Sequence, residues 1–316
     1  MGNASGAVSS VHLAGQQPQD QAPVFRVETP LVVIRFQVLR SGRLVGDLRE
    51  EQIQILEDGV PRPLALFEGP QSGRRNVPIV MILLLDVSES VMNSGLLNGA
   101  VLKETVLGGL DESASIGVYA FQRRSRQFCS PTRDIKILEQ SLREAYAFEG
   151  RGSMIYESIV QVSREVARQN PGSVRVMIVF SDGFETGKAA AENAVAAAGQ
   201  NDFKLFPVVL GHSRVAERAH RARPETRGQG EWQEKQMAEF AEIGELTGGR
   251  SFDPLLISPV VVREILRIVA LETSNEYVTG YFAEPSEGPP RKRSARVILA
   301  DKSLGKLRGG RKEYTR

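Results

Sequence analysis

The stretch from Val77 to Ser90 reads VPIVMILLLDVSES, an apolar run that ends in an acidic, hydroxyl-rich loop. An unbroken apolar run of this length is typical of a strand that is buried on both faces of a parallel sheet. It is about half as long as a membrane-spanning helix needs to be, so it does not indicate a membrane span. The stretch therefore predicts the central strand of an α/β fold, with Asp86, Ser88 and Ser90 directly after it.

Strands and helices alternate along the chain after this run. Further strands are predicted at Ser115–Gln122, Val174–Phe180 and Lys204–Leu210. Between strands, apolar residues recur at helical spacing, as in Ile155, Ile159, Val162 and Val166. Ser258-Pro259 provides an N-cap and a first-turn proline for a last helix. This alternation predicts a doubly wound, mostly parallel sheet.

Segments with strand patterns alone flank this α/β unit. On the N-terminal side, apolar and polar residues alternate, and Asp58-Gly59 indicates a hairpin. On the C-terminal side the predicted strands are Tyr277–Phe282, Ala295–Leu299 and Lys312–Thr315. Neither segment alone has enough strands for a core of its own. We therefore expect the two segments to pair into one small β-sandwich, with the α/β domain inserted between them.

Four regions follow from these patterns. Residues 1–23 are predicted to be a disordered lead-in, in which no signal peptide is visible. Residues 24–72 are expected to supply the N-terminal strands of the sandwich, and residues 73–275 to form the α/β domain. Residues 276–316 are expected to supply the C-terminal strands and to end in a basic tail.

Composition narrows the classes of function. The chain has 316 residues and a net charge of only +2, so its overall charge indicates no nucleic-acid partner. Cys129 is the single cysteine, which excludes an internal disulfide. A Cys/His zinc cluster is not expected either, because the chain has only three histidines: His12, His212 and His220. The sequence does not indicate an oligomeric state.

Oxygen-bearing side chains cluster at three points of the predicted sheet. Asp86, Ser88 and Ser90 follow the first strand, Asp182 follows the third, and Ser153 precedes a helix. Open α/β sheets bind ligands at the carboxyl ends of their strands, so these side chains can converge there. Two carboxylates and three hydroxyls, without sulfur or imidazole, suit Mg²⁺, or else Mn²⁺ or Ca²⁺, better than zinc or copper.

Charge balance predicts how such an ion would be used. Two aspartates neutralise a divalent cation, and the hydroxyls add ligands but no charge. The metal therefore remains able to accept one more anionic oxygen from outside. An Asp or Glu carboxylate of a partner protein is the natural candidate, because charge-assisted contacts of this kind are strong.

These residues resemble the metal-ion-dependent adhesion site of von Willebrand factor A domains. The segment from Gly152 to Glu157 is similar to that family's Gly-Thr-x-Leu-Tyr-Asp segment, with Ser153 at the threonine position. The serine keeps the oxygen but loses the methyl group that restricts the rotamer. The resemblance implies that the serines bind the metal directly and the aspartates directly or through water: Asp86, Ser88, Ser90, Ser153 and Asp182.

The order of the segments resembles a bacterial family. The pattern Leu-x-x-Glu-x-Ile-x-Ile-x-Glu-Asp-Gly from Leu48 to Gly59, the metal-site domain, Tyr281-Phe282 and a basic tail are together similar to the "von Willebrand factor A-related, acidobacterial" family. Members of that family usually carry export signals. The resemblance therefore implies a secreted or periplasmic location, although this chain shows no such signal.

Three functions compete. The one we expect is not enzymatic: a metal-dependent protein-binding module for adhesion or assembly. A magnesium-dependent phosphohydrolase also has an aspartate after a buried strand, but it needs a second acid two positions later, where this chain has Ser88. The third is a structural von Willebrand factor A module whose metal site is unused.

The charged segment from His212 to Glu234 follows the fourth predicted strand. It is predicted to be an irregular loop at the metal edge of the sheet, either as a specificity loop beside the metal or as a solvated insertion. Trp232, the only tryptophan, is either an anchor for a partner or an apolar contact onto the helix that contains Met237.

Overall fold

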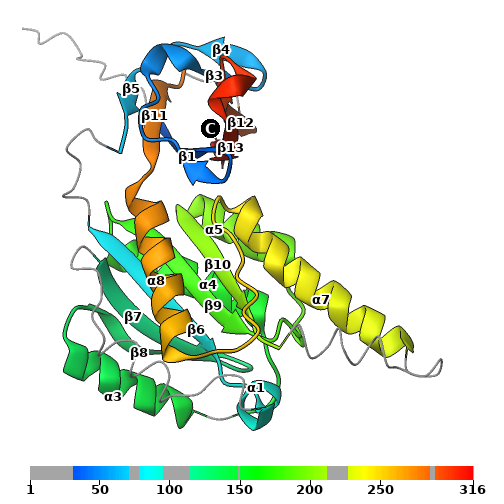
Figure 1. Ribbon diagram of the computed structural model, residues 1–316. Coiled ribbons are helices and arrows are strands. Elements are labelled where there is room, and N and C mark those ends of the chain that lie inside the picture. The colour runs from blue at the N-terminus through cyan, green and yellow to red at the C-terminus, as the bar shows by residue number, and fades with distance from the viewer. Residues whose placement is uncertain are drawn as a thin grey trace, which may run out of the picture.

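The computed structural model describes residues 31–70, 78–94, 114–148, 150–211, 227–284 and 289–315. The predicted lead-in, residues 1–23, lies outside these ranges. Figure 1 shows two units, an α/β unit and a smaller unit of strands. Among the described helices, none is both long enough and apolar enough to cross a membrane.

The α/β unit is built on one five-stranded sheet. β6 (Ile79–Asp86) lies at its centre, between β9 (Val174–Ser181) and β7 (Ala114–Phe121). β10 (Phe203–Val209) and β8 (Ser125–Thr132) form the edges. All neighbouring strands are parallel except β8, which is antiparallel to β7. The predicted doubly wound, mostly parallel sheet is confirmed.

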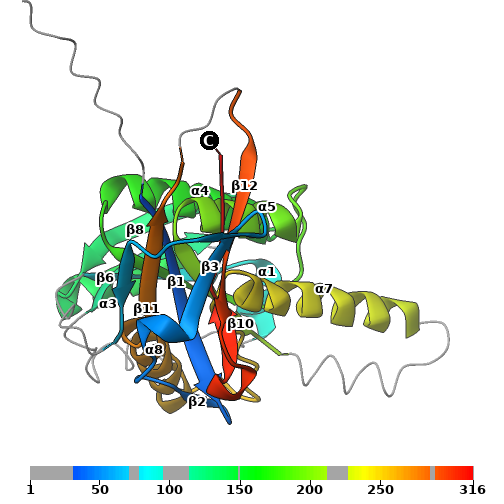
Figure 2. The ribbon, with the colours of Figure 1, turned by 90° about the horizontal axis from the view of Figure 1, so that it is seen from above.

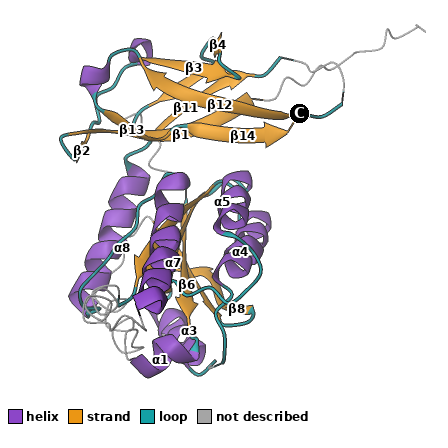
Figure 3. Ribbon diagram, turned by 90° about the vertical axis from the view of Figure 1, so that its right-hand side faces the viewer, coloured by secondary structure: helices purple, strands orange, loops and turns teal. Residues whose placement is uncertain are grey.

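Helices cover both faces of this sheet (Figure 3). One face carries α1 (Glu89–Ser94), α3 (Ile135–Tyr146) and α8 (Pro259–Ser274). The other carries α4 (Ile155–Gln169), α5 (Ala191–Gln200) and α7 (Arg227–Leu246). Successive side chains of β6 enter the two apolar clusters in turn, with Leu83 in the first and Leu84 in the second. Because both faces are covered, every residue of β6 is buried.

α7 begins earlier than the sequence pattern predicts. Residues 227–234 are helical, so the expectation of an irregular loop there is wrong. These residues show no apolar periodicity because α7 extends away from the sheet at its N-terminal end (Figure 1). The rest of the predicted loop, residues 212–226, lies outside the described residues.

The N- and C-terminal segments pair into one sandwich, as predicted. One sheet has the order β13 (Lys306–Gly309), β1 (Leu31–Arg40), β11 (Tyr277–Phe282) and β5 (Leu66–Glu68), with β2 (Arg43–Leu44) paired to β1. The other has the order β14 (Arg311–Thr315), β12 (Lys292–Leu299), β3 (Ile53–Glu57) and β4 (Val60–Arg62). Two single 3-10 turns complete the unit, at Glu50–Gln52 and Lys302–Leu304.

β1 pairs with β11 and β13, and β3 pairs with β12, so the first and last parts of the chain share both sheets (Figure 2). The chain passes from the sandwich into the α/β unit between β5 and β6, and it passes back into the sandwich between α8 and β11. The domain limits 24–72, 73–275 and 276–316 remain predictions.

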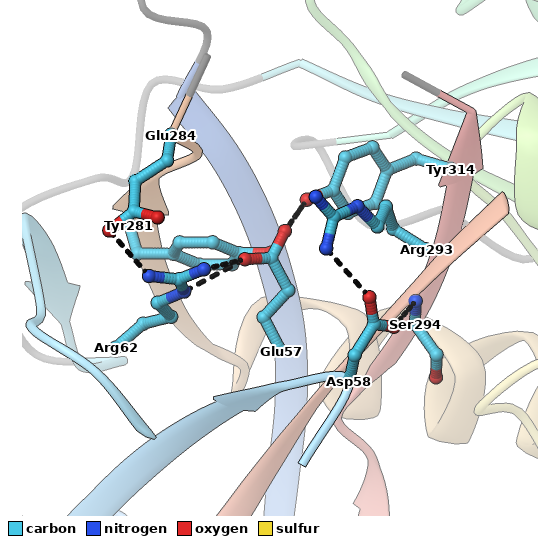
Figure 4. A network of polar contacts seen from close by, with 8 residues as sticks. All are labelled: Glu57, Asp58, Arg62, Tyr281, Glu284, Arg293, Ser294 and Tyr314. Atoms are coloured by element: carbon cyan, nitrogen blue, oxygen red, sulfur yellow. Dashed lines mark hydrogen bonds and ion pairs between the residues drawn. The ribbon is translucent and has the colours of Figure 1, made fainter. Parts of the chain in front are cut away.

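A buried carboxylate, Glu57, is the centre of a polar network in the sandwich (Figure 4). Nε and Nη2 of Arg62 both lie 2.8 Å from its Oε2, and the hydroxyl of Tyr314 donates to its Oε1. The hydroxyl of Tyr281 lies 2.9 Å from that of Tyr314. Burial alone would raise the pKa of Glu57, but hydrogen bonds from Tyr314, Arg62 and Tyr281 together lower it. The network therefore links β3 and β4 to strands from the far end of the chain.

The sandwich lies at the amino-terminal edge of the α/β sheet (Figure 1). Lys204, the second residue of β10, pairs with Glu276, which directly precedes β11. Lys312 of β14 lies 2.9 Å from Asp202, which directly precedes β10. The carboxyl ends of the parallel strands therefore lie at the opposite edge of the sheet, away from the sandwich.

Candidate metal site

Asp86 is the last residue of β6 and is completely buried. Its Oδ1 accepts a hydrogen bond of 2.9 Å from the backbone N–H of Ser88. Its Oδ2 accepts hydrogen bonds from the hydroxyls of Ser153, at 2.9 Å, and Ser181, at 2.6 Å. The three chain segments that the sequence places at this edge therefore meet at one carboxylate.

Asp182 directly follows β9 and is also buried. The backbone N–H of Phe184 donates to its Oδ1 at 3.2 Å, and its carboxylate accepts a hydrogen bond from Ser90. The hydroxyl of Ser90 lies 3.2 Å from that of Ser88. Among the five predicted ligand residues, Ser90 is the only one that is exposed. The structure thus brings all five predicted residues together, and their role as metal ligands remains a prediction.

The two aspartates repel each other. Burial, followed by the negative charge of Asp86, raises the pKa of Asp182 to about 6. Burial also raises the pKa of Asp86, and hydrogen bonds from Ser181, Ser88 and Ser153 oppose this rise. Within the described part of the chain, neither aspartate is paired with a lysine or an arginine. Buried charges are normally paired or bound to a metal, so this pair is suited to a cation.

The donor atoms fit a hard cation because all of them are oxygens. In the ranges that the structure describes, no group of three or more His, Cys, Asp or Glu side chains could hold a metal. The candidate site is not a group of that kind, because it has only two carboxylates and its other possible ligands are serine hydroxyls. This composition favours Mg²⁺, Mn²⁺ or Ca²⁺ over ions that prefer sulfur or imidazole.

Ser181 is the residue in contact with Asp86 that the list of predicted ligands does not include. It is the last residue of β9, and its hydroxyl makes the shortest hydrogen bond to Asp86. Its direction depends on the register of β9 on β6, in which Leu85 pairs with Phe180. The run Ser181-Asp182-Gly183 is the only sequence signal, and it does not show which of its oxygens faces Asp86.

Hydrogen bonds between the loops fix the position of Ser153. Oγ1 of Thr186 accepts from the backbone N–H of Ser153 at 2.8 Å and donates to its carbonyl at 3.0 Å. The Glu185 carboxylate accepts from the backbone N–H of Tyr156, in the first turn of α4, at 2.9 Å. The loop after β9 therefore holds the loop before α4 in place.

Gly183 allows the loop after β9 to lie directly against α7. Its φ is +78°, a region that residues with a Cβ adopt rarely. A Cβ at this position would lie 3.2 Å from Cα of Met237. Glycine is thus required both by the backbone conformation and by the packing.

Thr186→Val is expected to weaken metal binding about tenfold, because loss of a residue that orients a ligand typically costs tenfold to a hundredfold in affinity. Valine keeps the shape of threonine and the backbone hydrogen bond of residue 186 to the Ser153 carbonyl, but it loses both hydrogen bonds of the hydroxyl. Calorimetric titration with MnCl2 measures the effect, and Thr186→Ser, which keeps the hydroxyl, is the control. Equal affinity in the valine variant and the wild type would show that this contact does not position Ser153.

Residues 81–185 match the family model of the von Willebrand factor type A domain. The chain contains a von Willebrand factor type A (vWA) domain. The matched part of the vWA domain runs from β6 to the loop after β9 and includes all five candidate ligands.

Solved structures resemble the chain at low sequence identity. An aerotolerance-related membrane protein from Bacteroides fragilis is 14% identical over 62% of this chain and 98% of its own, with a TM-score of 0.45. A von Willebrand factor type A protein from Catenulispora acidiphila is 11% identical over 89% of this chain and 73% of its own, with a TM-score of 0.46.

A third similar structure is that of proximal thread matrix protein 1 from the mussel byssus, which has a zinc-occupied MIDAS motif. It is 12% identical over 67% of this chain and 49% of its own, with a TM-score of 0.43. A search of curated protein sequences found no match. The vWA assignment therefore depends on the family match and on the fold.

Proposed function

We propose that the vWA domain binds a divalent cation, Mg²⁺ or else Mn²⁺ or Ca²⁺, and presents it to an Asp or Glu carboxylate of a partner protein. The proposed ligands are the five residues of the candidate metal site, with the aspartates binding directly or through water: Asp86, Ser88, Ser90, Ser153 and Asp182. The protein would then serve as a metal-dependent adhesion or assembly module.

The observation that carries this proposal is the pair of buried carboxylates, beside which the described residues place no cationic side chain. A divalent cation would neutralise both, and the serine hydroxyls would add ligands without charge. The bound ion could then accept one further anionic oxygen, and a carboxylate would make a charge-assisted contact with it. Because Ser90 is the exposed member of the site, the partner would reach the ion from its side.

We propose binding rather than catalysis. A phosphohydrolase of the kind considered above needs a second acid two residues after Asp86, and Ser88 stands there. The backbone N–H of Ser88 donates to Asp86, so this position orients the aspartate. An extracytoplasmic location belongs to the proposal too, and its support is the family resemblance alone.

Titration calorimetry with MgCl2 and MnCl2 tests the proposal. We expect the wild type to bind one ion and Asp86→Ala to bind at least about a hundredfold more weakly, because a charged ligand is lost. Ser90→Ala, at an exposed position, should bind about tenfold more weakly without a change in fold. Asp134→Asn is the control, since Asp134 caps α3 just after the end of β8, where Thr132 pairs with Ile116 toward the opposite edge of the sheet, and asparagine caps equally well. Absence of binding in the wild type would refute the proposal.

A further inference from the structure

An arginine-bearing hairpin flanks the candidate metal site on one side. The turn between β7 and β8 contains Arg123 and Arg124, both exposed. The backbone N–H of Met154 donates to the carbonyl of Gln122 at 2.8 Å, which fixes this turn against the loop that contains Ser153. A Cβ on Gly152 would lie 3.2 Å from Cγ of Arg123. The side chain of Arg123 therefore lies directly beside the loop of one proposed ligand.

The exposed acid of the β6 loop already has a partner. Glu89, between the two serines of the β6 loop, lies 3.4 Å from the guanidinium of Arg151. Arg123 and Arg124 are not neutralised by that pair. The described side chains of this flank consequently carry excess positive charge, which attracts acidic groups and repels basic ones.

An aromatic pair flanks the site on the other side. Trp232 of α7 is 52% exposed and stacks on Phe184, with ring centroids 6.4 Å apart and an interplanar angle of 21°. Phe184 is two residues from Asp182 and donates its backbone N–H to that carboxylate. Oε1 of Gln236 accepts from the backbone N–H of Glu185 at 3.1 Å, so α7 is joined to the same loop. The exposed indole is thus held in place beside the site.

The two flanks lie on opposite sides because β6 lies between β7 and β9 in the sheet. They also differ in charge. Around Trp232, α7 carries Glu231, Glu234 and Glu239 against Lys235, and this net negative charge would repel an acidic group. A bound segment would therefore direct its acidic side toward the hairpin and its apolar side toward α7.

We propose that the partner of this site is a protein segment that carries three groups in a fixed order. A second acidic side chain binds Arg123 or Arg124, the metal-binding carboxylate follows it, and a large apolar side chain packs on Trp232 and Phe184. This inference depends on the proposed metal site and adds the chemistry that selects the partner. Exposed tryptophan is among the residues that contribute most to binding at interfaces, and charge complementarity fixes orientation.

Selection from a displayed random peptide library tests the inference. The full chain is immobilised in MgCl2, and bound peptides are eluted with EDTA. We expect peptides in which an acidic residue has a second acid on one side and an aromatic or long aliphatic residue on the other. The same selection on Arg123→Glu/Arg124→Glu should lose the second acid, and that on Trp232→Ala should lose the apolar residue.

Titration of the wild type and of each variant with one selected synthetic peptide measures how much each contact contributes to binding affinity. We expect either variant to weaken its binding about tenfold while binding remains sensitive to EDTA. Arg296→Glu/Arg311→Glu, which reverses two exposed charges of the sandwich, is the control and should leave affinity unchanged.

The outcomes separate this inference from the proposed function. A wild type that binds no Mg²⁺ or Mn²⁺ in calorimetry refutes the metal site and the inference together. If the metal binds but EDTA elutes no enriched peptide, or elutes acidic peptides without the two neighbouring groups, the inference is overturned and the metal site stands. Equal peptide affinity of the wild type and both flank variants overturns it as well.

Discussion

Arg62→Met is expected to destabilise the sandwich by roughly 3 kcal/mol, because removal of one partner leaves a buried charge uncompensated. Glu57 is 3% exposed, and Arg62 provides two of the N–H groups that its carboxylate accepts (Figure 4). Methionine fills a similar volume but donates no hydrogen bond. Glu57 would then keep only the hydroxyls of Tyr314 and Tyr281, and no cationic hydrogen-bond donor, as partners of its buried carboxylate.

Hydrogen–deuterium exchange of β3, β12 and β14 measures this loss where it occurs, and urea unfolding gives its size. The companion change Glu57→Gln, made together with Arg62→Met, removes the uncompensated charge and should recover much of the stability. Arg267→Met is the control, since Arg267 of α8 pairs at 2.6 Å with Glu264, both side chains are more than half exposed, and exposed pairs contribute little. A double variant no more stable than Arg62→Met would contradict the explanation.

The sequence predicts the α/β sheet well where burial leaves a simple pattern. β6 is apolar throughout because both of its faces are covered, and α4 shows one apolar face because the other meets solvent. β8 escapes prediction since it is an edge strand with polar residues and Pro131, and only part of it is covered. The first turns of α7 escape it because they extend beyond the sheet, and none of the described side chains from 228 to 234 is fully buried.

The site follows the same division. Asp86, Ser153 and Asp182 are predictable because each stands where a strand ends or a helix begins, and those positions share one edge of the sheet. Ser181 depends on the register between two strands, which no local pattern encodes. The stacking of Trp232 on Phe184 depends on the docking of α7. Contacts between distant segments therefore determine the part of the site that the sequence leaves open.

Asp182→Asn is expected to stabilise the metal-free protein at neutral pH while it abolishes stabilisation by metal. The pKa of Asp182 is raised from 3.8 to about 6 by burial and by the charge of Asp86, which corresponds to a cost of up to roughly 3 kcal/mol for the ionised form. Asparagine removes that charge and keeps an oxygen for the backbone N–H of Phe184. In MgCl2 the difference in unfolding free energy between the two proteins should become smaller or change sign, because only the wild type gains free energy from metal binding.

The dependence on pH distinguishes charge repulsion from a packing effect. A carboxyl group whose pKa is raised by folding contributes stability fully below its ordinary pKa of 3.8, and this contribution is lost as the pH rises through about 6. In EDTA, the wild type should therefore gain stability relative to Asp182→Asn when the pH falls from about 7.5 to about 5. Urea unfolding of both proteins at the two pH values measures this difference, and Asp134→Asn should track the wild type at both. If Asp182→Asn is less stable than the wild type in EDTA at neutral pH, the two carboxylates do not repel each other and the case for a cation between them loses its main support.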